Sequence, residues 1–494
     1  MLKTVRTRFA PSPTGYMHIG NLRTALYEYL IARSSGGKFI LRIEDTDQKR
    51  YVGGSVDIIY NTLKMAGLKH DEGPDIGGAH GPYVQSQRKD IYLPYAKKLV
   101  ETGHAYYCFC SRERLEEYGK AAAADGSSSH ISPGYDRHCR NLSPDVVKSS
   151  LDAGMPFVIR QKMPFQGSTS FEDMVYGTIT IPNVELDDQI LVKSDGLPTY
   201  NFANVIDDHL MEITHVVRGS EYLTSTPKYK LLYEAFGWSV PVYVHLPLIT
   251  KPGGDKMSKR AGDPSFEDLA SMGFLVEAVV NYVALLGWSP GDEREFFTLE
   301  ELEKSFNIEG ISKSPAVFDI EKLKWMNSEY IRRMDPGKFH KIASVYYEGL
   351  GDNIDKRKLS GVLQQRTVLL PDILSNIGFL KELPDHGISL YTHVKMKTDP
   401  NSSLPALKSA LNELEKVREW NSDALHETLI TLASTLGIKN GQLLWPVRVA
   451  LTGLPVSPGG AVEIACILGR DESLRRIRKG IAKLENAGTQ NIPV

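Results

Sequence analysis

A histidine and a group of cations, far apart in the chain, have the chemistry to bind a nucleotide. His18 lies in a proline- and glycine-rich loop, residues 10–21, directly before a predicted helix. The backbone N–H groups at the start of a helix, together with a histidine, can hold the phosphates of ATP. Lys256, Lys259 and Arg260 lie in a second glycine-rich loop, where cations can neutralise charge that develops on phosphates during a reaction.

Neither loop matches the two commonest phosphate-binding motifs. No G-x-G-x-x-G occurs in residues 10–21, and Gly20 is followed by Asn21 and Leu22 where a Walker loop requires lysine and serine or threonine. By itself, the first loop is typical of a tight turn and the second of a solvated basic segment. Because one chain carries both loops, a site for the phosphates of a nucleotide is favoured.

The segments around the first loop predict the start of a doubly wound α/β domain. Residues 3–9 are typical of a short strand, and residues 39–43 of a strand buried in a parallel sheet. Ligands of such domains bind at the carboxyl ends of the strands, which is where the first loop lies. A helix is predicted between the strands from apolar residues at helical spacing, namely Leu22, Ala25, Leu26, Tyr29 and Leu30.

Length and composition exclude several classes of protein. The chain has 494 residues, which predicts several domains, and its 41% hydrophobic and 24% charged residues are those of an ordinary soluble protein. The net charge of -2 excludes a field over the whole molecule that would attract nucleic acid, so a nucleic-acid site must be a local patch. Four cysteines are too few for a disulfide framework and no apolar run is long enough to span a membrane, so a cytoplasmic protein is expected.

The pattern of elements predicts five segments. Strand signals at residues 157–160 and 178–181 indicate a domain inserted into the α/β fold. Helical periodicities at residues 275–286, 404–417 and 424–436 indicate helical domains nearer the C-terminus. The predicted segments are residues 1–87 and 194–250 for the two halves of a split Rossmann-type domain, 88–193 for the inserted α/β domain, 251–333 for a helical domain that carries the second loop, and 334–494 for an all-α region.

Two motifs together resemble known signatures. His18-Ile-Gly20-Asn21 and Lys256-Met-Ser-Lys259-Arg260 resemble the paired HIGH and KMSKS signatures of class I aminoacyl-tRNA synthetases, with Asn21 in place of the second histidine. The resemblance narrows to the bacterial-type glutamyl-tRNA synthetases and extends from residue 5 to about residue 480. It is carried by residues 8–15, 42–47, 195–209, 213–219 and 444–453.

This resemblance implies a two-step ligase reaction. Glutamate attacks the α-phosphorus of ATP to give glutamyl-adenylate and pyrophosphate, and the glutamyl group then passes to the terminal ribose of a tRNA. No protein nucleophile is required, so catalysis is positioning and charge stabilisation by His18, Lys256, Lys259 and the Mg²⁺ bound with the nucleotide. The residues implied to bind ATP are Thr14, Gly15, His18, Gly20, Asn21, Glu221, Tyr222, Lys256, Ser258, Lys259 and Arg260.

A pocket for glutamate must satisfy two carboxylates and one ammonium group, which requires fixed cations and at least one anion. Arginine suits this task because its planar guanidinium binds a carboxylate through two parallel hydrogen bonds and stays charged. The resemblance assigns Arg8 and Arg218 to substrate carboxylate, Ser12 and Glu44 to the α-amino end, and Tyr200 and Asn204 to the wall of the pocket.

Acidic residues after the second predicted strand allow two interpretations. Glu44, Asp45 and Asp47 have the oxygen ligands that a divalent cation prefers. The alternative is that they form ion pairs with nearby cations such as Arg42, Lys49 or Arg50.

Three cysteines also allow two interpretations. Cys108, Cys110 and Cys139 supply three of the four ligands of a structural zinc site. Some relatives carry a histidine two residues after the third cysteine, but Asn141 stands there in this chain, with His138 and Tyr135 nearby. A zinc site and three reduced thiols packed in a small domain both remain open.

The resemblance further implies that segment 88–193 binds the tRNA acceptor stem, that segment 251–333 contacts the stem, and that segment 334–494 binds the anticodon. Residues 363–371 resemble the segment whose arginine contacts the anticodon, so Arg366 is the candidate base reader. Residues 470–483 hold six cations against two acids, which suits either phosphates or a solvated helix face. The expected partner of this monomer is tRNA-Glu, and tRNA-Gln as well if the enzyme misacylates it.

Three other functions are compatible with parts of this pattern. A glutaminyl-tRNA synthetase shares the catalytic segments but resembles a pair of β-barrels at its C-terminus, whereas this C-terminus has helical periodicity. A tRNA-modifying relative lacks an anticodon-binding domain. A non-catalytic tRNA-binding relative has no need of the cations and the histidine that this chain keeps.

Overall fold

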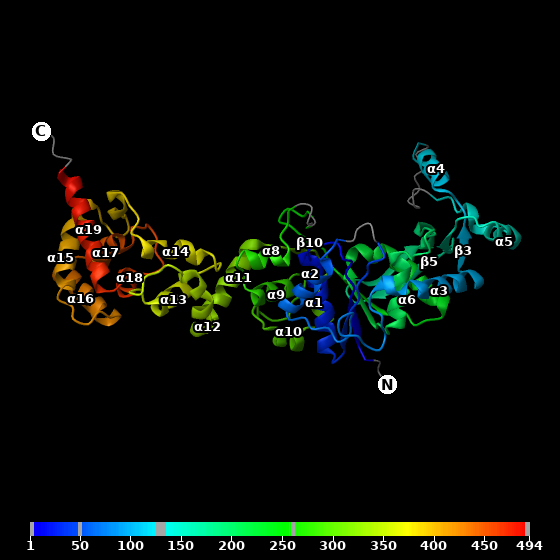
Figure 1. The fold of residues 1–494 in the computed structure, drawn as a ribbon, viewed down its shortest axis with the longest axis horizontal. Helices are drawn as coiled ribbons and strands as arrows, with labels where there is room; N and C mark the ends of the chain where they lie inside the picture. Colours follow the sequence, from blue (N-terminus) through cyan, green and yellow to red (C-terminus); the bar gives the residue numbers. More distant parts are fainter. Residues whose placement is uncertain (1–3, 48–51, 125–134, 256, 258–261, 490–494) are drawn as a thin grey trace. The chain divides into compact units, whose positions relative to one another are not determined.

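The computed structural model describes residues 4–47, 52–124, 135–255, 257 and 262–489 (Figure 1). The chain divides into two compact units, and each is described by itself. The first unit comprises Met1–Ala270 and Val279–Asp319, and the second comprises Ser271–Ala278 and Ile320–Val494.

The first unit begins with the strand, helix and strand that the sequence predicts. β1 (Arg6–Phe9) and β2 (Lys38–Leu41) pair in parallel. Parallel neighbours need a crossover, and α1 (Ile19–Ser34) supplies it. Most of α1 is buried, including its polar residues Arg23 and Glu28. The loop between β1 and α1 therefore emerges at the carboxyl end of β1, as predicted.

A four-stranded sheet forms the other half of this fold, in the order β6-β5-β9-β8. β5, β9 and β8 are parallel neighbours, and β5 forms an antiparallel hairpin with β6. The backbone N–H of Thr214, directly before β8, donates to the carbonyl of Arg6 in β1 at 3.0 Å, which links the two halves. Two strands from the segment predicted as an insert, β5 and β6, thus belong to this main sheet. The strands are β5 (Ser168–Asp173), β6 (Gly177–Pro182), β8 (His215–Gly219) and β9 (Val242–Leu246).

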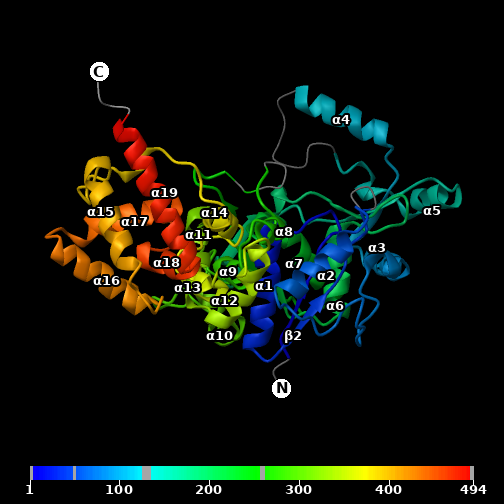
Figure 2. The ribbon, with the colours of Figure 1, turned by 60° about the vertical axis from the view of Figure 1, so that its left-hand side comes forward.

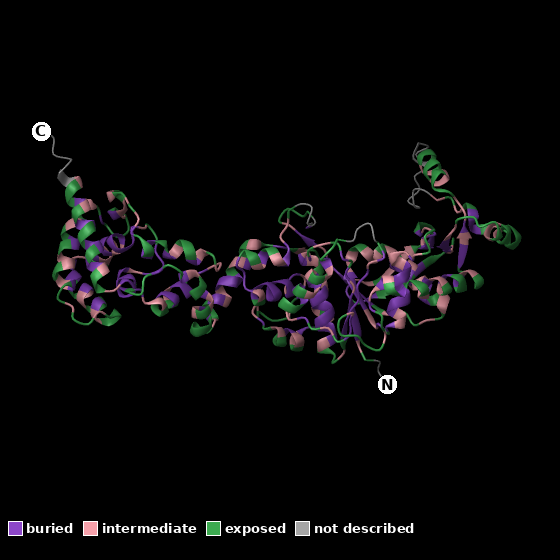
Figure 3. Ribbon diagram, in the orientation of Figure 1, coloured by how far each residue is buried: buried purple, intermediate pink, exposed green. Residues whose placement is uncertain are grey.

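A smaller antiparallel sheet has the order β3-β4-β7. Its apolar face shares a core with α3 and α6 around Tyr92, Ile159 and Phe202. The helices α4 and α5 are mostly exposed (Figure 3). These elements are α3 (Lys89–Glu101), β3 (Ala105–Cys108), α4 (Arg112–Ala124), α5 (Pro144–Asp152), β4 (Val158–Gln161), β7 (Ile190–Val192) and α6 (Tyr200–Leu210).

The predicted strands at residues 157–160 and 178–181 correspond to β4 and β6, and the predicted helix at residues 275–286 to α9. No helix among the described residues is long and apolar enough to cross a membrane. The remaining elements before residue 320 are α2 (Ser55–Met65), α7 (Thr226–Phe236), β10 (Ile249–Thr250), α8 (Phe266–Ser271), α9 (Val276–Ala284), α10 (Leu299–Ser305) and β11 (Ala316–Val317).

The second unit is helical throughout its described residues, and α15 to α19 gather around one core (Figure 2). The helices predicted at residues 404–417 and 424–436 correspond to α15 and α16. The helices of the unit are α11 (Ile320–Arg333), α12 (Pro336–Ala343), α13 (Lys356–Gln364), α14 (Asp372–Lys381), α15 (Pro400–Leu414), α16 (Ser422–Thr435), α17 (Asn440–Thr452), α18 (Ala461–Leu468) and α19 (Arg470–Thr489).

Candidate active site

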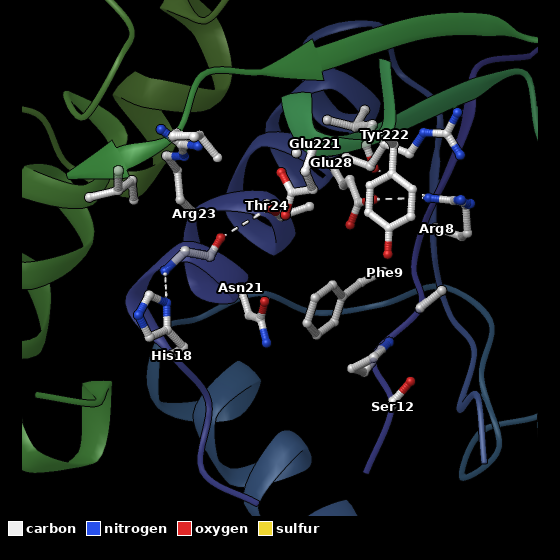
Figure 4. A pocket seen from close by; sticks show the side chains of 18 of the residues that line it. Arg8, Phe9, Ser12, His18, Asn21, Arg23, Thr24, Glu28, Glu221 and Tyr222 are labelled. Carbon is white, nitrogen blue, oxygen red and sulfur yellow. Dashed lines mark hydrogen bonds and ion pairs between the residues drawn. The ribbon is translucent and has the colours of Figure 1, made fainter. Parts of the chain in front are cut away.

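A cavity of about 430 Å³ opens in the first unit where β1, β8 and β9 end (Figure 4). Ligands of doubly wound folds bind at this edge of the sheet. Three predicted residues, Gly15, Glu44 and Asn204, are not part of the cavity wall. The predicted residues that do line it are Arg8, Ser12, Thr14, His18, Gly20, Asn21, Tyr200, Arg218, Glu221 and Tyr222.

The start of α1 is organised by His18. Its extended backbone makes His18 the N-cap, and the N–H of Gly20 donates to its Nδ1 at 2.9 Å. A Cβ at Gly20 would lie 3.1 Å from that same Nδ1, so a larger residue would crowd the ring. The cap orients the imidazole beside a helix N-terminus, which carries partial positive charge and favours anions.

The second predicted loop lies largely outside the described residues. Lys256, Ser258, Lys259 and Arg260 fall there, so their placement stays a prediction. Met257, between them in sequence, is buried and lines the cavity, and its N–H donates to the carbonyl of Ile249 in β10 at 3.2 Å. This hydrogen bond ties the motif to the edge of the cavity.

Arg8 belongs to a buried chain of ion pairs. Its Nε donates to Asp208 at 3.0 Å and its Nη1 to Glu28 at 3.3 Å. Asp208 also pairs with Arg42 at 2.7 Å, and Arg42 with Glu44 at 3.0 Å. Buried charges require such partners, because an isolated one would lose its hydration without compensation. This network fixes Arg8 at the cavity wall.

The network shifts the acidity of its carboxyl groups. Burial raises the pKa of Glu44 to about 7, although Arg42 and Arg8 act in the opposite direction. Burial also raises the pKa of Glu28 well above its ordinary value against the charge of Arg8. Burial alone would also raise the pKa of Asp208, but the charges of Arg8 and Arg42 have a larger, opposite effect, and this pKa is lowered. The two glutamates therefore hold protons far more readily than free carboxyl groups do.

In the described range 4–47, Glu44, Asp45 and Asp47 do not come together as a set of metal ligands. Among the described residues, Cys108, Cys110 and Cys139 are the one group of three that could hold a metal ion. Glu44 instead pairs with Arg42, in line with the ion-pair alternative. Asp45 accepts a hydrogen bond from the backbone N–H of Ser86 at 2.8 Å.

Arg218, in β8, is the second arginine of the cavity. Its Nη2 donates to the hydroxyl of Thr226 at 2.8 Å and its Nε to Nε2 of His245 at 3.1 Å. Its guanidinium carbon lies 4.4 Å from the ring centre of Tyr229 and 5.0 Å from that of Tyr222, within the range of cation–π contacts. Arg218 is therefore held by its neighbours at the wall of the cavity.

The other predicted residues differ in their surroundings. Tyr200 and Tyr222 lie with ring centres 6.0 Å apart, and Glu221 precedes Tyr222 in the 3-10 helix η4 (Ser220–Ser225). Asn204, in α6, is buried, and its Nδ2 has no partner among the described residues. Ser12 and Thr14 are exposed in the loop after β1.

Two charged residues of α1 line the cavity but were not predicted. Arg23 donates from Nη1 to the carbonyl of Leu286 at 3.1 Å, and Glu28 contacts Arg8 as described. One oxygen of Glu28, Oε2, is buried with no partner among the described residues. Both interrupt a helix that is otherwise mostly apolar and buried, and charged residues at such positions are the signal in the sequence that could have indicated them.

The three cysteines come together in the smaller sheet and the loops beside it. All three thiols are reduced, and their sulfur atoms lie within 4.8 Å of one another. Burial alone would raise the pKa of Cys108. Hydrogen bonds from Tyr135 and from the backbone of Cys110 have the opposite effect, and the pKa is lowered overall. Tyr135 is thus next to the cluster.

In the second unit, Arg366 is exposed in the turn after α13. The cations of residues 470–483 are mostly paired with acids: Arg475 with Glu472, Arg478 with Glu415 and Lys483 with Asp385. Arg476 is buried inside the unit and does not reach a surface. The basic run is therefore a weaker phosphate surface than its composition indicates.

Two sequence models of protein families match the chain. The model of "tRNA synthetases class I (E and Q), catalytic domain" matches residues 4–325, and that of "Anticodon binding domain" matches residues 320–481.

Individual relatives match over almost the whole chain. The glutamate–tRNA ligase of Clostridium acetobutylicum is 58% identical over 97% of this chain and 99% of its own, and that of Clostridium tetani is 55% identical over 98% of each. Among solved structures, a glutamate tRNA ligase from Elizabethkingia meningosepticum in complex with its amino acid is similar with a TM-score of 0.88 at 36% identity, over 98% of this chain and 100% of its own. The chain therefore belongs to the glutamate–tRNA ligase family of class I tRNA synthetases.

Proposed function

We propose that this chain activates L-glutamate with ATP and transfers the glutamyl group to the 3′-terminal adenosine of tRNA-Glu. The observation that carries the proposal is the cavity in which two buried arginines, Arg8 and Arg218, meet the N-terminus of α1 capped by His18. Such a cavity offers cations to an amino acid with two carboxylates and N–H groups to a triphosphate. The near full-length identity to glutamate–tRNA ligases supports it.

In the first step the chain acts by positioning. Arg8 and Arg218 bind substrate carboxylate, and Ser12 and Tyr200 lie beside the rest of the amino acid. Glu44 and Asn204 do not line the cavity, so they would act on the amino acid from outside its wall. ATP enters with Mg²⁺ as part of the substrate, with its phosphates at the start of α1. Lys256 and Lys259 neutralise the charge that builds up as pyrophosphate leaves. Thr14, Gly15, Gly20, Asn21, Glu221, Tyr222, Ser258 and Arg260 complete the nucleotide site.

The second step needs the tRNA. Segments 88–193 and 251–333 would contact its acceptor arm, and the helical second unit its anticodon, with Arg366 reading a base. The helical architecture of that unit favours this function over glutaminyl-tRNA synthetase, for which β-barrels were expected. Charging of tRNA-Gln, a monomeric state and a cytoplasmic location stay predictions.

A structural zinc ion is also proposed, because the donor set fits. Three thiols within 4.8 Å match the thiolate ligands of structural zinc sites, and the phenol of Tyr135, hydrogen-bonded to Cys108, is one candidate for a fourth ligand. Bound zinc would hold the ends of this loop-rich region together. One equivalent of zinc in the purified protein, lost in Cys139→Ser, would support the site, and its absence would leave three packed thiols.

The amino-acid site is tested by Arg218→Ala. The substitution removes the charge-assisted partner of a carboxylate, so the KM for glutamate should rise by about tenfold or more while the KM for ATP stays unchanged. ATP–pyrophosphate exchange with tRNA present measures both constants. Equal rises in both would assign Arg218 a structural role instead.

A further inference from the structure

Three neighbouring strands place an acid, a histidine and an arginine in one row. Arg218 in β8 stands directly opposite His245 in β9, and Asp173 ends β5 on the other side of β9. The side chains of Asp173 and His245 are fully buried, and Arg218 alone of the three lines the cavity. The row therefore runs from the interior of the sheet to the cavity.

The hydrogen bonds along this row have a fixed direction. Nδ1 of His245 lies 2.6 Å from Oδ2 of Asp173, and a carboxylate can only accept, so Nδ1 carries the proton. Nε2 then has a lone pair, and Nε of Arg218 donates to it at 3.1 Å. Burial lowers the pKa of His245 although Asp173 acts in the opposite direction, so the ring stays neutral and keeps this lone pair.

Asp173 is held as firmly as the histidine. Its Oδ1 accepts from the backbone N–H groups of Val175 and Tyr176, each at 2.9 Å, and its Oδ2 also accepts from the backbone N–H of His245 at 3.1 Å. Four donors therefore converge on one carboxylate. Such a group has no freedom to turn and gives its partner a single orientation.

We infer that His245 and Asp173 are positioning residues, which set the plane of the Arg218 guanidinium so that its remaining N–H groups meet substrate carboxylate. Nε is taken by His245 and one N–H of Nη2 by Thr226, and no acceptor for Nη1 lies within hydrogen-bond distance among the described residues. The inference rests on the proposed role of Arg218 in binding glutamate. A guanidinium aligned in advance binds a carboxylate without losing further side-chain freedom.

The test compares two substitutions of one residue. His245→Leu removes the acceptor, whereas His245→Gln can place an amide oxygen near the position of Nε2. In ATP–pyrophosphate exchange, His245→Leu should raise the KM for glutamate by about tenfold and change the KM for ATP by less than about twofold. In His245→Gln, the KM for glutamate should return most of the way to that of the unsubstituted protein. Val244→Ala, at the adjacent buried position of β9, is the matched control for a general packing defect and should leave the KM for glutamate unchanged.

A coupling measurement separates this inference from the proposed function. In an Arg218→Lys background, where the Nε donor is absent, His245→Leu should add no further rise in KM. If Arg218→Lys alone leaves the KM for glutamate unchanged, the proposed role of Arg218 falls and this inference falls with it. If Arg218→Lys raises the KM but His245→Leu does not, only the positioning role is overturned.

A spectroscopic signature tests the row in the unsubstituted protein. In protein labelled with ¹⁵N-histidine, the ring of His245 should show a protonated Nδ1 and an unprotonated Nε2 at neutral pH. Its signals are identified by their loss in His245→Gln. A proton on Nε2 at neutral pH would overturn the inference, because the ring could then not accept from Arg218.

Discussion

At the scale of single residues, the cavity is shaped by charges that stabilise one another. Arg42 is completely buried between Asp208 and Glu44, and Asp208 in turn holds Arg8 at the cavity wall. Removing one partner from such a chain leaves a buried charge uncompensated, at a cost of about 3–5 kcal/mol. Desolvation also raises the pKa of Glu44 to about 7, so this carboxyl group titrates near neutrality.

Glu44 should give glutamate binding a pH dependence. Its pKa is raised to about 7 by burial, so the negative charge that it would contribute near the substrate ammonium is progressively lost as the pH falls below that value. The KM for glutamate should therefore rise as the pH falls from about 8 to about 6, approaching tenfold per unit at the acid end. Exchange kinetics at several pH values measure this effect.

Glu44→Gln is the control for this dependence. The amide keeps the size of the side chain but does not titrate, so the variant should have a raised KM that is flat over the same pH range. A slope that survives in Glu44→Gln would assign the titration to another group.

The sequence predicted most residues of the cavity because their motifs are local. His18, Gly20 and Asn21 share one loop, and Arg218, Glu221 and Tyr222 share another segment. Glu28 was missed because its significance depends on Arg8, which lies in another element and meets it only in the folded chain. Asp173 and His245 were missed for the same reason, since strand order and register bring them together.

At the scale of elements, the order strand, loop, helix, strand could be predicted from apolar spacing and from proline and glycine. The helix begins at Ile19, within the loop predicted over residues 10–21, because His18 caps it. β5 was not predicted, since Phe171 is the one apolar residue in its sequence and its pairing with β9 is not visible in a single segment.

The last helix shows the limit of reading charge from sequence. Arg476 reaches into the core of the second unit, where its Nη1 donates to the carbonyls of Phe379 at 2.9 Å and Leu451 at 2.8 Å. Arg475, its neighbour, is exposed and pairs with the same Glu472. One run of cations therefore holds both a structural arginine and a solvated one.

These two arginines predict opposite outcomes. Arg476→Ala removes the donor to two buried carbonyls and one of the cations paired with Glu472. It should lower the free energy of unfolding by about 3–5 kcal/mol. Arg475→Ala should cost less than about 1 kcal/mol, because exposed ion pairs contribute little. Denaturant unfolding of the full chain compares them. Equal losses would contradict the assignment of Arg476 to the core.

At the scale of the whole molecule, the first unit holds the cavity and the second matches the model of an anticodon-binding domain. Arg366 is exposed. The pKa of Arg448 in α17 is lowered mainly by the burial of Arg448 and secondly by the charge of Arg366. The two guanidinium groups therefore lie near each other on this unit, in a place suited to an unstacked base.

Arg366→Gln should change the ratio of kcat/KM for tRNA-Glu over tRNA-Gln by about tenfold, since one base contact discriminates by about 1–3 kcal/mol. Neutralising Arg475 and Arg478 together should affect both tRNAs alike and by less, because each is already paired with a glutamate. An unchanged ratio in folded Arg366→Gln protein would remove this residue from the recognition site.

The most direct measurement of the central claim is aminoacylation of purified tRNA-Glu with ATP and either glutamate or glutamine. The account predicts a glutamyl ester on tRNA-Glu, with AMP and pyrophosphate released, and a negligible rate with glutamine, whose neutral amide cannot pair with the arginines of the cavity. Preferential attachment of glutamine, or no ester with either amino acid in folded protein, would contradict it.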